Sequence, residues 1–158
     1  TYLQDLRRVK RVATSQVTES FAGTGFAFED LRAEDLHAHR YRTVGRKQIQ
    51  GRDAYLIEAR PIRGRVRALK GYSKRIIYVD AVHWVEMQID FYDHQGRHAK
   101  TQHHTKWQSV ANIWRPYRVK MVEHLRHRTT WLRFRSWEAN VKLDDELFTT
   151  RELIREHR

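Results

Sequence analysis

The stretch Ile76–Trp107 reads IIYVDAVHWVEMQIDFYDHQGRHAKTQHHTKW and decides the fold. In its middle, strict alternation predicts a strand whose dry face is formed by Val85, Met87, Ile89 and Phe91. The polar run 93–96 ends in Gly96, which can adopt positive φ, so the chain should turn into a second strand near Arg97. Residues 79–83 predict another reversal, after a strand that starts near residue 74. The stretch therefore predicts an antiparallel meander.

The rest of the chain repeats this pattern. Strands are expected at residues 2–3, 6–12, 39–48, 54–59, 117–125 and 129–137, with Pro61 ending the fourth. The last two strands add Val119, Met121, Leu132 and Phe134 to the apolar face. Only residues 29–36 predict a short helix, and the turn at 143–148 is expected to pack Leu147 and Phe148 against the sheet. We therefore expect a mainly β protein with one large, curved antiparallel sheet, a half-barrel with few short helices.

The composition fits a single domain with a packed core. The 158 residues are 40% hydrophobic, and no apolar run approaches the ~20 residues of a membrane-spanning helix. The formal net charge of +12 attracts polyanions, either nucleic acid or an anionic lipid surface. Arginine is scattered along nearly every segment and not gathered in one run, which also fits a generally basic surface without such a partner. The basic residues that we expect to dock on an anionic surface are Arg7, Arg8, Lys10, Arg11, Arg133 and Arg135.

The sequence gives no support for an enzyme. It contains no cysteine and no Gly-x-Ser-x-Gly motif, and its carboxylates do not form a catalytic pair. Histidines gather at 94, 98, 103 and 104, but alternation places His98 and His104 on one face and His103 on the other. Because a metal centre needs three or four converging ligands, we expect no metal and no cofactor.

Tryptophans and arginines alternate near the end of the chain. Alternation predicts one face that carries Trp131, Arg133, Arg135 and Trp137. Such a face could stack nucleic-acid bases, lie on a membrane or protein interface, or pack under covering elements. These three interpretations stay open at the level of the sequence.

Short motifs along the chain resemble the bacterial outer-membrane lipoprotein-sorting proteins, relatives of the periplasmic lipoprotein carrier LolA. The motifs are Tyr2-Leu3 with Leu6–Val12, Phe21-x-Gly23 with Phe26 and Glu29-Asp30-Leu31, Gly51-Arg52-x-x-Tyr55-x-Ile57-Glu58-x-x-Pro61, Val79-Asp80, Phe91-Tyr92-Asp93-x-x-Gly96, Ile113-Trp114-x-Pro116, and Leu143-Asp144-Asp145-x-Leu147-Phe148-Thr149. Two positions depart from the family pattern, which usually has Pro where Gln4 stands and Asp where Gly25 stands. The likeness covers nearly the whole chain, and it implies that residues 1–158 are one domain, the C-terminal part of a longer LolA-like domain.

The resemblance implies a non-enzymatic periplasmic carrier. It would hold a lipid or the acyl chains of a lipoprotein in an apolar cavity on the concave face of the sheet, for sorting toward the outer membrane. The expected cavity residues are Val85, Met87, Ile89, Phe91, Val119, Met121, Leu132 and Phe134. The expected partners are an inner-membrane transporter, an outer-membrane acceptor and a peripheral membrane contact. Two alternatives remain, a basic nucleic-acid-binding β domain and a structural domain that docks onto a membrane transporter.

Overall fold

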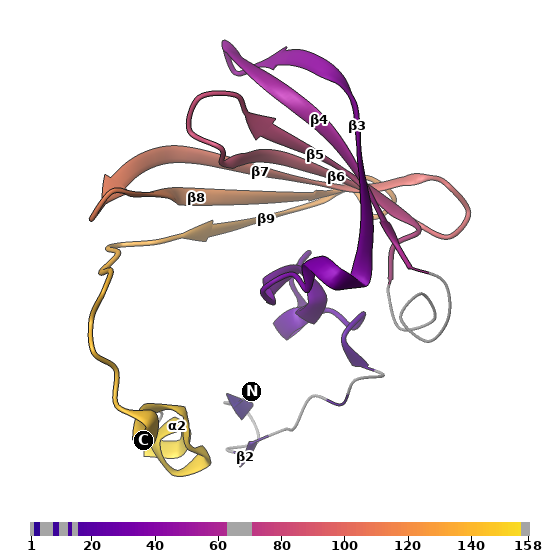
Figure 1. The fold of residues 1–158 in the computed structure, drawn as a ribbon. Coiled ribbons are helices and arrows are strands. Elements are labelled where there is room, and N and C mark those ends of the chain that lie inside the picture. Colours follow the sequence, from indigo (N-terminus) through magenta and orange to yellow (C-terminus); the bar gives the residue numbers. More distant parts are fainter. Residues whose placement is uncertain (1, 4–7, 10–12, 14–15, 63–70, 156–158) are drawn as a thin grey trace.

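The computed structural model describes residues 2–3, 8–9, 13, 16–62 and 71–155. Within these residues, seven strands form one antiparallel sheet in which each strand pairs with its neighbour in the sequence (Figure 1). The strands are β3 (His39–Ile49), β4 (Arg52–Pro61), β5 (Lys74–Asp80), β6 (Glu86–Tyr92), β7 (His98–Val110), β8 (Ile113–Glu123) and β9 (Arg128–Arg133). The predicted meander and the mainly β fold class are confirmed.

The sheet is curved and does not close into a barrel. β3 and β9 form its two edges and are not paired with each other. Irregularities in the strand register interrupt the pairing between β3 and β4, between β5 and β6, and between β6 and β7. Such bulges bend a strand and increase its twist, which suits a sheet that arches over other elements. Figure 1 shows this arch.

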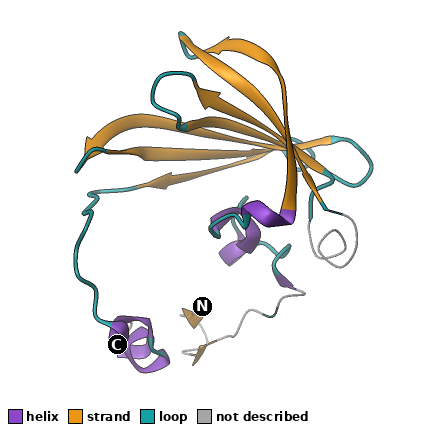
Figure 2. Cartoon of the chain, in the orientation of Figure 1, coloured by secondary structure: helices purple, strands orange, loops and turns teal. Residues whose placement is uncertain are grey.

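Three short 3-10 helices lie beneath the arch: η3 (Phe21–Gly23), η4 (Phe28–Leu31) and η5 (Leu36–Ala38). We call the face of the sheet that is turned toward η3 and η4 the concave face, and its opposite the convex face. Beyond β9 the chain leaves the sheet and ends in η6 (Asp145–Phe148) and α2 (Thr150–Arg155), near the small pair β1 (Tyr2–Leu3) and β2 (Arg8–Val9) (Figure 2). Within the described residues, no helix has the length and apolar character needed to cross a membrane.

The helix expected over residues 29–36 is wrong. The chain forms η4 and η5 there instead, and Arg32 between them has extended φ and ψ. Tertiary ion pairs explain the break, because the Glu34 carboxylate binds Arg75 on β5 and His39 at the start of β3. A continuous helix would not leave Glu34 free to reach both partners.

The expectation for Leu147 and Phe148 is also wrong. Both side chains are exposed, and that of Phe148 is 74% exposed. The η6 turn that carries them is held by local bonds, since the Asp144 side chain accepts the Glu146 N–H. With the segment lying away from the sheet, nothing in the described part of the chain covers these two residues (Figure 1).

The main core lies on the concave face. Phe26, from the segment beneath the arch, is buried against the sheet, and Phe21 packs beside it. The strands contribute Ala59, Ile77, Ile89, Phe91, Val119 and Met121, with Ile57, Val79, Leu132 and Phe134 partly buried around them. This cluster contains six of the eight residues that the sequence placed on one apolar face.

Met87 belongs to a different cluster, so the prediction that it shares a face with Ile89 and Phe91 is wrong. It is buried with Ala54 and Tyr78 on the convex face. The cause is a bulge: Tyr78 pairs with Gln88, whereas the next residue of β5 pairs with Glu86. One extra residue on β6 therefore shifts the alternation that holds along the rest of the strand.

Gly25 occupies a crowded position beneath the sheet. A Cβ atom there would lie 3.2 Å from Thr130 Oγ1 and 3.3 Å from Glu123 Oε2. An Asp, the usual residue of the family pattern at this place, would bring a second carboxylate beside the buried carboxylate of Glu123. Glycine fits here because of space and not because of backbone conformation.

The buried carboxylate of Asp80 leads us to expect a loss of stability in acid. Burial alone would raise its pKa, but hydrogen bonds from the His83 and Val82 N–H groups and the charge of Arg52 hold that pKa below its ordinary value. A carboxylate with a lowered folded-state pKa stabilises the protein above its unfolded pKa of about 3.9. That stabilisation is lost as the pH falls through the folded-state pKa.

Urea unfolding from pH 7 to pH 3 should show a falling free energy of unfolding below about pH 5, and Asp80→Asn should flatten this fall. Equal slopes for both proteins would contradict the prediction.

Candidate functional site

A groove of about 340 Å³ opens on the concave side of the sheet. It lies where β6 begins, where β7 and β8 form their hairpin, and beyond the end of β9. Its walls are mainly aromatic and aliphatic: Val85, Trp107, Trp114, Pro116, Val119, Phe134 and Trp137, with Glu86, His104 and Arg115 as the polar members. Val119 and Phe134 also border the main core cluster, so the groove continues the apolar concave surface.

Trp137 forms one wall of the groove in a fixed orientation. Its ring centroid lies 4.4 Å from that of Phe134, and its Nε1 donates a hydrogen bond to the Pro116 carbonyl, 3.2 Å away. The Arg115 guanidinium lies 5.7 Å from the Trp137 ring centroid, which is within cation–π range. This wall therefore presents a large apolar surface beside a positive charge.

His104 contributes to the groove as a neutral group. Its Nε2 accepts a hydrogen bond from the Gln102 amide, 2.7 Å away, so its Nδ1 carries the proton and donates to the Glu86 carbonyl. Burial lowers the pKa of His104. The imidazole therefore stays uncharged at neutral pH, which suits an apolar ligand.

Glu86 brings the one carboxylate among the groove residues. It pairs in register with Val79, so it faces the concave side. The surrounding protein raises the pKa of Glu86, and the nearby charge of Glu34 raises it further. The Glu86 carboxylate is therefore protonated more readily than that of an ordinary surface glutamate.

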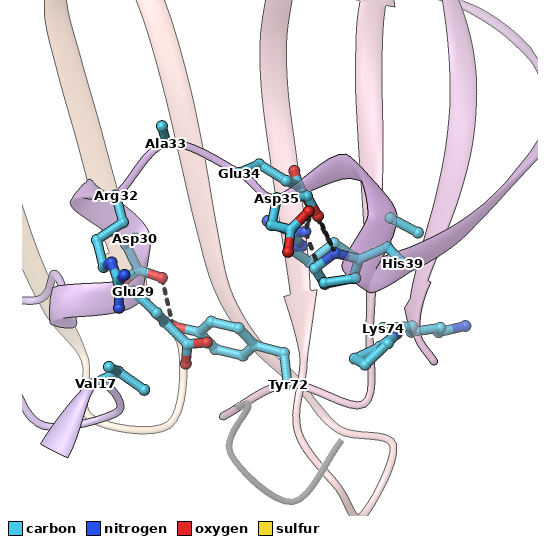
Figure 3. A pocket seen from close by; sticks show the side chains of 14 residues that line it. Val17, Glu29, Asp30, Arg32, Ala33, Glu34, Asp35, His39, Tyr72 and Lys74 are labelled. Atoms are coloured by element: carbon cyan, nitrogen blue, oxygen red, sulfur yellow. Dashed lines mark hydrogen bonds and ion pairs between the residues drawn. The ribbon is translucent and has the colours of Figure 1, made fainter. Parts of the chain in front are cut away.

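A second pocket, of about 250 Å³, lies between η4, η5 and the adjoining ends of β4 and β5 (Figure 3). It is polar, and its acidic groups have partners. Asp30 accepts hydrogen bonds from the Tyr72 hydroxyl, 2.8 Å away, and from the Ala27 N–H, 2.7 Å away. Glu29 accepts the Gly71 N–H, 2.9 Å away. Burial and Asp30 raise the pKa of Tyr72, so its phenol stays protonated as the donor. These contacts fasten the segment beneath the arch to the sheet, so we assign this pocket a structural role.

Comparisons with known proteins agree with this fold. A family model with the description "Uncharacterized protein" matches residues 1–155. The solved structure of an outer membrane lipoprotein-sorting protein domain from Vibrio parahaemolyticus is 25% identical, with a TM-score of 0.86 over 99% of this chain. The chain belongs to the matched family and has the LolA-like fold.

Two further solved structures support the LolA-like fold. A DUF1329 family protein from Desulfovibrio piger is 22% identical, with a TM-score of 0.88 over 96% of this chain. A LolA superfamily protein from Nitrosomonas europaea is 21% identical, with a TM-score of 0.70 over 87% of this chain. The chain spans only 64%, 62% and 60% of the lengths of the three structures, in the order given. No curated protein matches the chain significantly.

The LolA-like sheet brings most of the expected cavity residues together. Ile89, Phe91, Val119, Met121, Leu132 and Phe134 share the concave cluster, and Val85 lines the groove together with Val119 and Phe134. Met87 alone lies on the other face. Ile89, Phe91, Val119 and Met121 are buried, so the open part of the surface is the part near the half-buried Val85 and Phe134.

The expected basic docking surface is only partly described. Arg7, Lys10 and Arg11 lie outside the described residues, and Arg8 belongs to β2. Arg133 and Arg135 are exposed. Their role in docking stays a prediction.

The predicted Trp–Arg face does not form as one surface. Trp131 lies on the convex face, where the Lys120 amine is 5.5 Å from its ring centroid. Trp137 instead turns to the groove, because β9 ends at Arg133 and strict alternation ends with it. The sequence pattern assigned the groove tryptophans Trp107 and Trp114 to no face. Lys106, in the left-handed region at φ 57°, breaks the alternation just before Trp107.

The histidines separate in a way that simple alternation missed. His98 lies on the convex face together with His103, and not with His104, because the register shifts between Phe91 and Tyr92. Thr101 Oγ1 is 2.9 Å from the Nε2 atoms of both His98 and His124. In the described part of the chain, no three His, Asp or Glu residues are grouped as a metal site.

Proposed function

We propose that the protein is a non-enzymatic carrier that holds the acyl chain of a lipid or lipoprotein on the concave face of its sheet. The observation that carries this proposal is the open groove, whose apolar walls run into the concave core at Val119 and Phe134. An acyl chain needs such a surface and no catalytic group. Binding would come from removing apolar area from water, worth about 25 cal/mol per Å² before the costs of ordering the chain.

The groove has features that suit a flexible, apolar ligand. Its aromatic walls offer large contact areas that do not depend on one ligand shape. His104 is held neutral, so no fixed positive charge stands at the apolar floor. Arg115, at the rim beside Trp137, can bind an anionic head group without entering the apolar part.

The carrier would work in the periplasm and pass its ligand toward the outer membrane. The likeness to a lipoprotein-sorting domain supports this location and this use. In this proposal the carrier receives its ligand from an inner-membrane transporter and passes it to an outer-membrane protein.

Native mass spectrometry of the full-length protein, purified without detergent, tests the carrier function. We expect bound acyl-containing molecules in near-stoichiometric amount, which organic extraction would identify. After delipidation, the protein should bind a fluorescent fatty acid again. A protein that purifies empty and binds no fatty acid would contradict the carrier function.

The same preparation tests the two alternatives. Oligonucleotide binding that falls steeply with the logarithm of salt concentration would favour a nucleic-acid-binding domain. A stable complex with a membrane transporter, formed while the groove stays empty, would favour a structural docking domain.

A further inference from the structure

The turn between β5 and β6, residues Asp80–Val85, is built around a buried carboxylate. We call it the Trp84 turn. Asp80 is fully buried, and its Oδ1 accepts the N–H groups of Val82 and His83, 2.9 and 2.6 Å away. The Trp84 N–H donates to the Asp80 carbonyl, 3.1 Å away, and the Asp80 N–H donates to the Val85 carbonyl, 2.9 Å away. These bonds hold the turn in one conformation.

The two neighbouring hairpins brace the Trp84 turn. Arg52, at the start of β4, places its Nε 2.7 Å from Asp80 Oδ2 and its Nη2 2.6 Å from His83 Nδ1. The edge of the His83 ring packs against Trp114 at the start of β8, with 4.4 Å between the ring centroids. The turn is therefore a rigid part of this end of the sheet.

This rigid turn presents apolar side chains to solvent. Val82 is 74% exposed and Trp84 is 70% exposed. Trp84 adopts φ 56°, a left-handed conformation that a bulky side chain rarely takes. A surface that holds exposed apolar groups in a strained but fixed position points to an interaction site.

Neighbouring side chains also fix the orientation of the Trp84 ring. It stacks in parallel on Tyr55 of β4, with 5.7 Å between the ring centroids. The Arg46 guanidinium of β3 lies 4.4 Å from the Tyr55 ring centroid and donates a hydrogen bond to the Tyr55 hydroxyl, 2.9 Å away. Arg46 and Trp84 thus both pack on the Tyr55 ring.

We infer that the Trp84 turn inserts Val82 and Trp84 into the head-group region of an anionic lipid bilayer. Tryptophan favours the membrane–water interface, and basic residues add attraction to anionic lipids. The basic groups near the turn are Arg46, Lys47, Arg52 and Arg115, and the acidic ones are Asp53, Asp80 and Glu86. The charge of Arg52 is paired with that of Asp80, so Arg46, Lys47 and Arg115 are the cations that remain for a partner. The net charge of +12 favours the same partner.

Insertion would bring the groove to the membrane. Val85 and Glu86, which line the groove, follow Trp84 directly in the chain. An acyl chain could then pass between the bilayer and the groove without crossing open water. This use rests on the proposed carrier function, whereas the insertion itself does not.

Because the chain has no cysteine, one introduced thiol can report on the turn. Full-length protein carrying Val82→Cys, labelled with an environment-sensitive fluorophore, is mixed with phosphatidylcholine vesicles that contain or lack phosphatidylglycerol. We expect a blue shift and a gain in fluorescence with the anionic vesicles, weakened by salt. Leu125→Cys is the matched control, since this exposed residue lies in the β8–β9 turn at the opposite end of the sheet.

A second pair of variants tests whether Trp84 drives binding. Trp84→Ala should lower the vesicle partition coefficient about tenfold or more, the value expected for burying a large aromatic side chain. Trp131→Ala removes an exposed tryptophan from the convex face and should leave partitioning unchanged.

The labelling experiment overturns the inference if position 82 gives no response, or if positions 82 and 125 respond equally. Full partitioning by the Trp84→Ala variant would overturn it too. Acyl-chain uptake without a response at position 82 would remove the insertion and leave the carrier function standing. Insertion without any acyl-chain uptake would support the insertion and contradict the carrier function.

Discussion

Replacing Phe134 by Asp is expected to abolish acyl-chain binding, with a loss of at least about 100-fold in affinity, or about 3 kcal/mol. Phe134 lies where the groove meets the concave core, and it packs against Trp137. A carboxylate at this point would have to lose its hydration whenever an apolar chain entered. Titration of the delipidated protein with a fluorescent fatty acid measures the effect.

Two further variants separate loss of binding from loss of folding. Val85→Asp places the same charge at the half-buried rim of the groove, outside the core cluster, and should also weaken binding. Trp131→Asp changes the convex face and should leave the affinity unchanged. If the Phe134→Asp protein keeps its far-ultraviolet circular dichroism and still binds with wild-type affinity, the groove is not the binding site.

Replacing Phe26 by Ala is expected to lower the free energy of unfolding by about 3–5 kcal/mol. The side chain is 1% exposed, and it joins the segment beneath the arch to the concave core. Its removal would leave a cavity between two parts of the chain that are far apart in sequence. Urea unfolding followed by tryptophan fluorescence measures the change in free energy. In a thermal scan, the same change should lower the melting temperature by about 10 °C.

Leu36→Ala is the matched control for Phe26→Ala. Leu36 belongs to the same segment, but its side chain is mostly exposed, so we expect a change within about 0.5 kcal/mol. A Phe26→Ala protein that loses less than about 1 kcal/mol would mean that the segment is only loosely docked. The concave surface would then be open over a greater area than the groove.

Much of the site was predictable because its residues follow the two-residue period of a strand. Val119, Met121 and Leu132 lie on uninterrupted stretches of β8 and β9, where alternation holds and their common face follows directly. Phe134 follows β9 directly and is still hydrogen-bonded to Tyr117 of β8. The same rule failed for Met87 and His98, each next to a register shift. A bulge adds one residue to one strand only, so its position depends on the partner strand and is not written in the local pattern.

The sequence by itself determined the meander, its strands and most of the apolar face, because hydrophobic period and turn residues are local signals. Only the tertiary structure decided which part of that face is covered and which part stays open. The covering segment is held by contacts such as Glu34 with Arg75 and Asp30 with Tyr72, which join residues about 40 positions apart. The rigid exposure of Trp84 likewise depends on Asp80 at the end of β5 and on Arg52 and Tyr55 of β4, which the pairing of these two strands brings together. Contacts between distant segments form only when the sheet does, so no local pattern could have announced them.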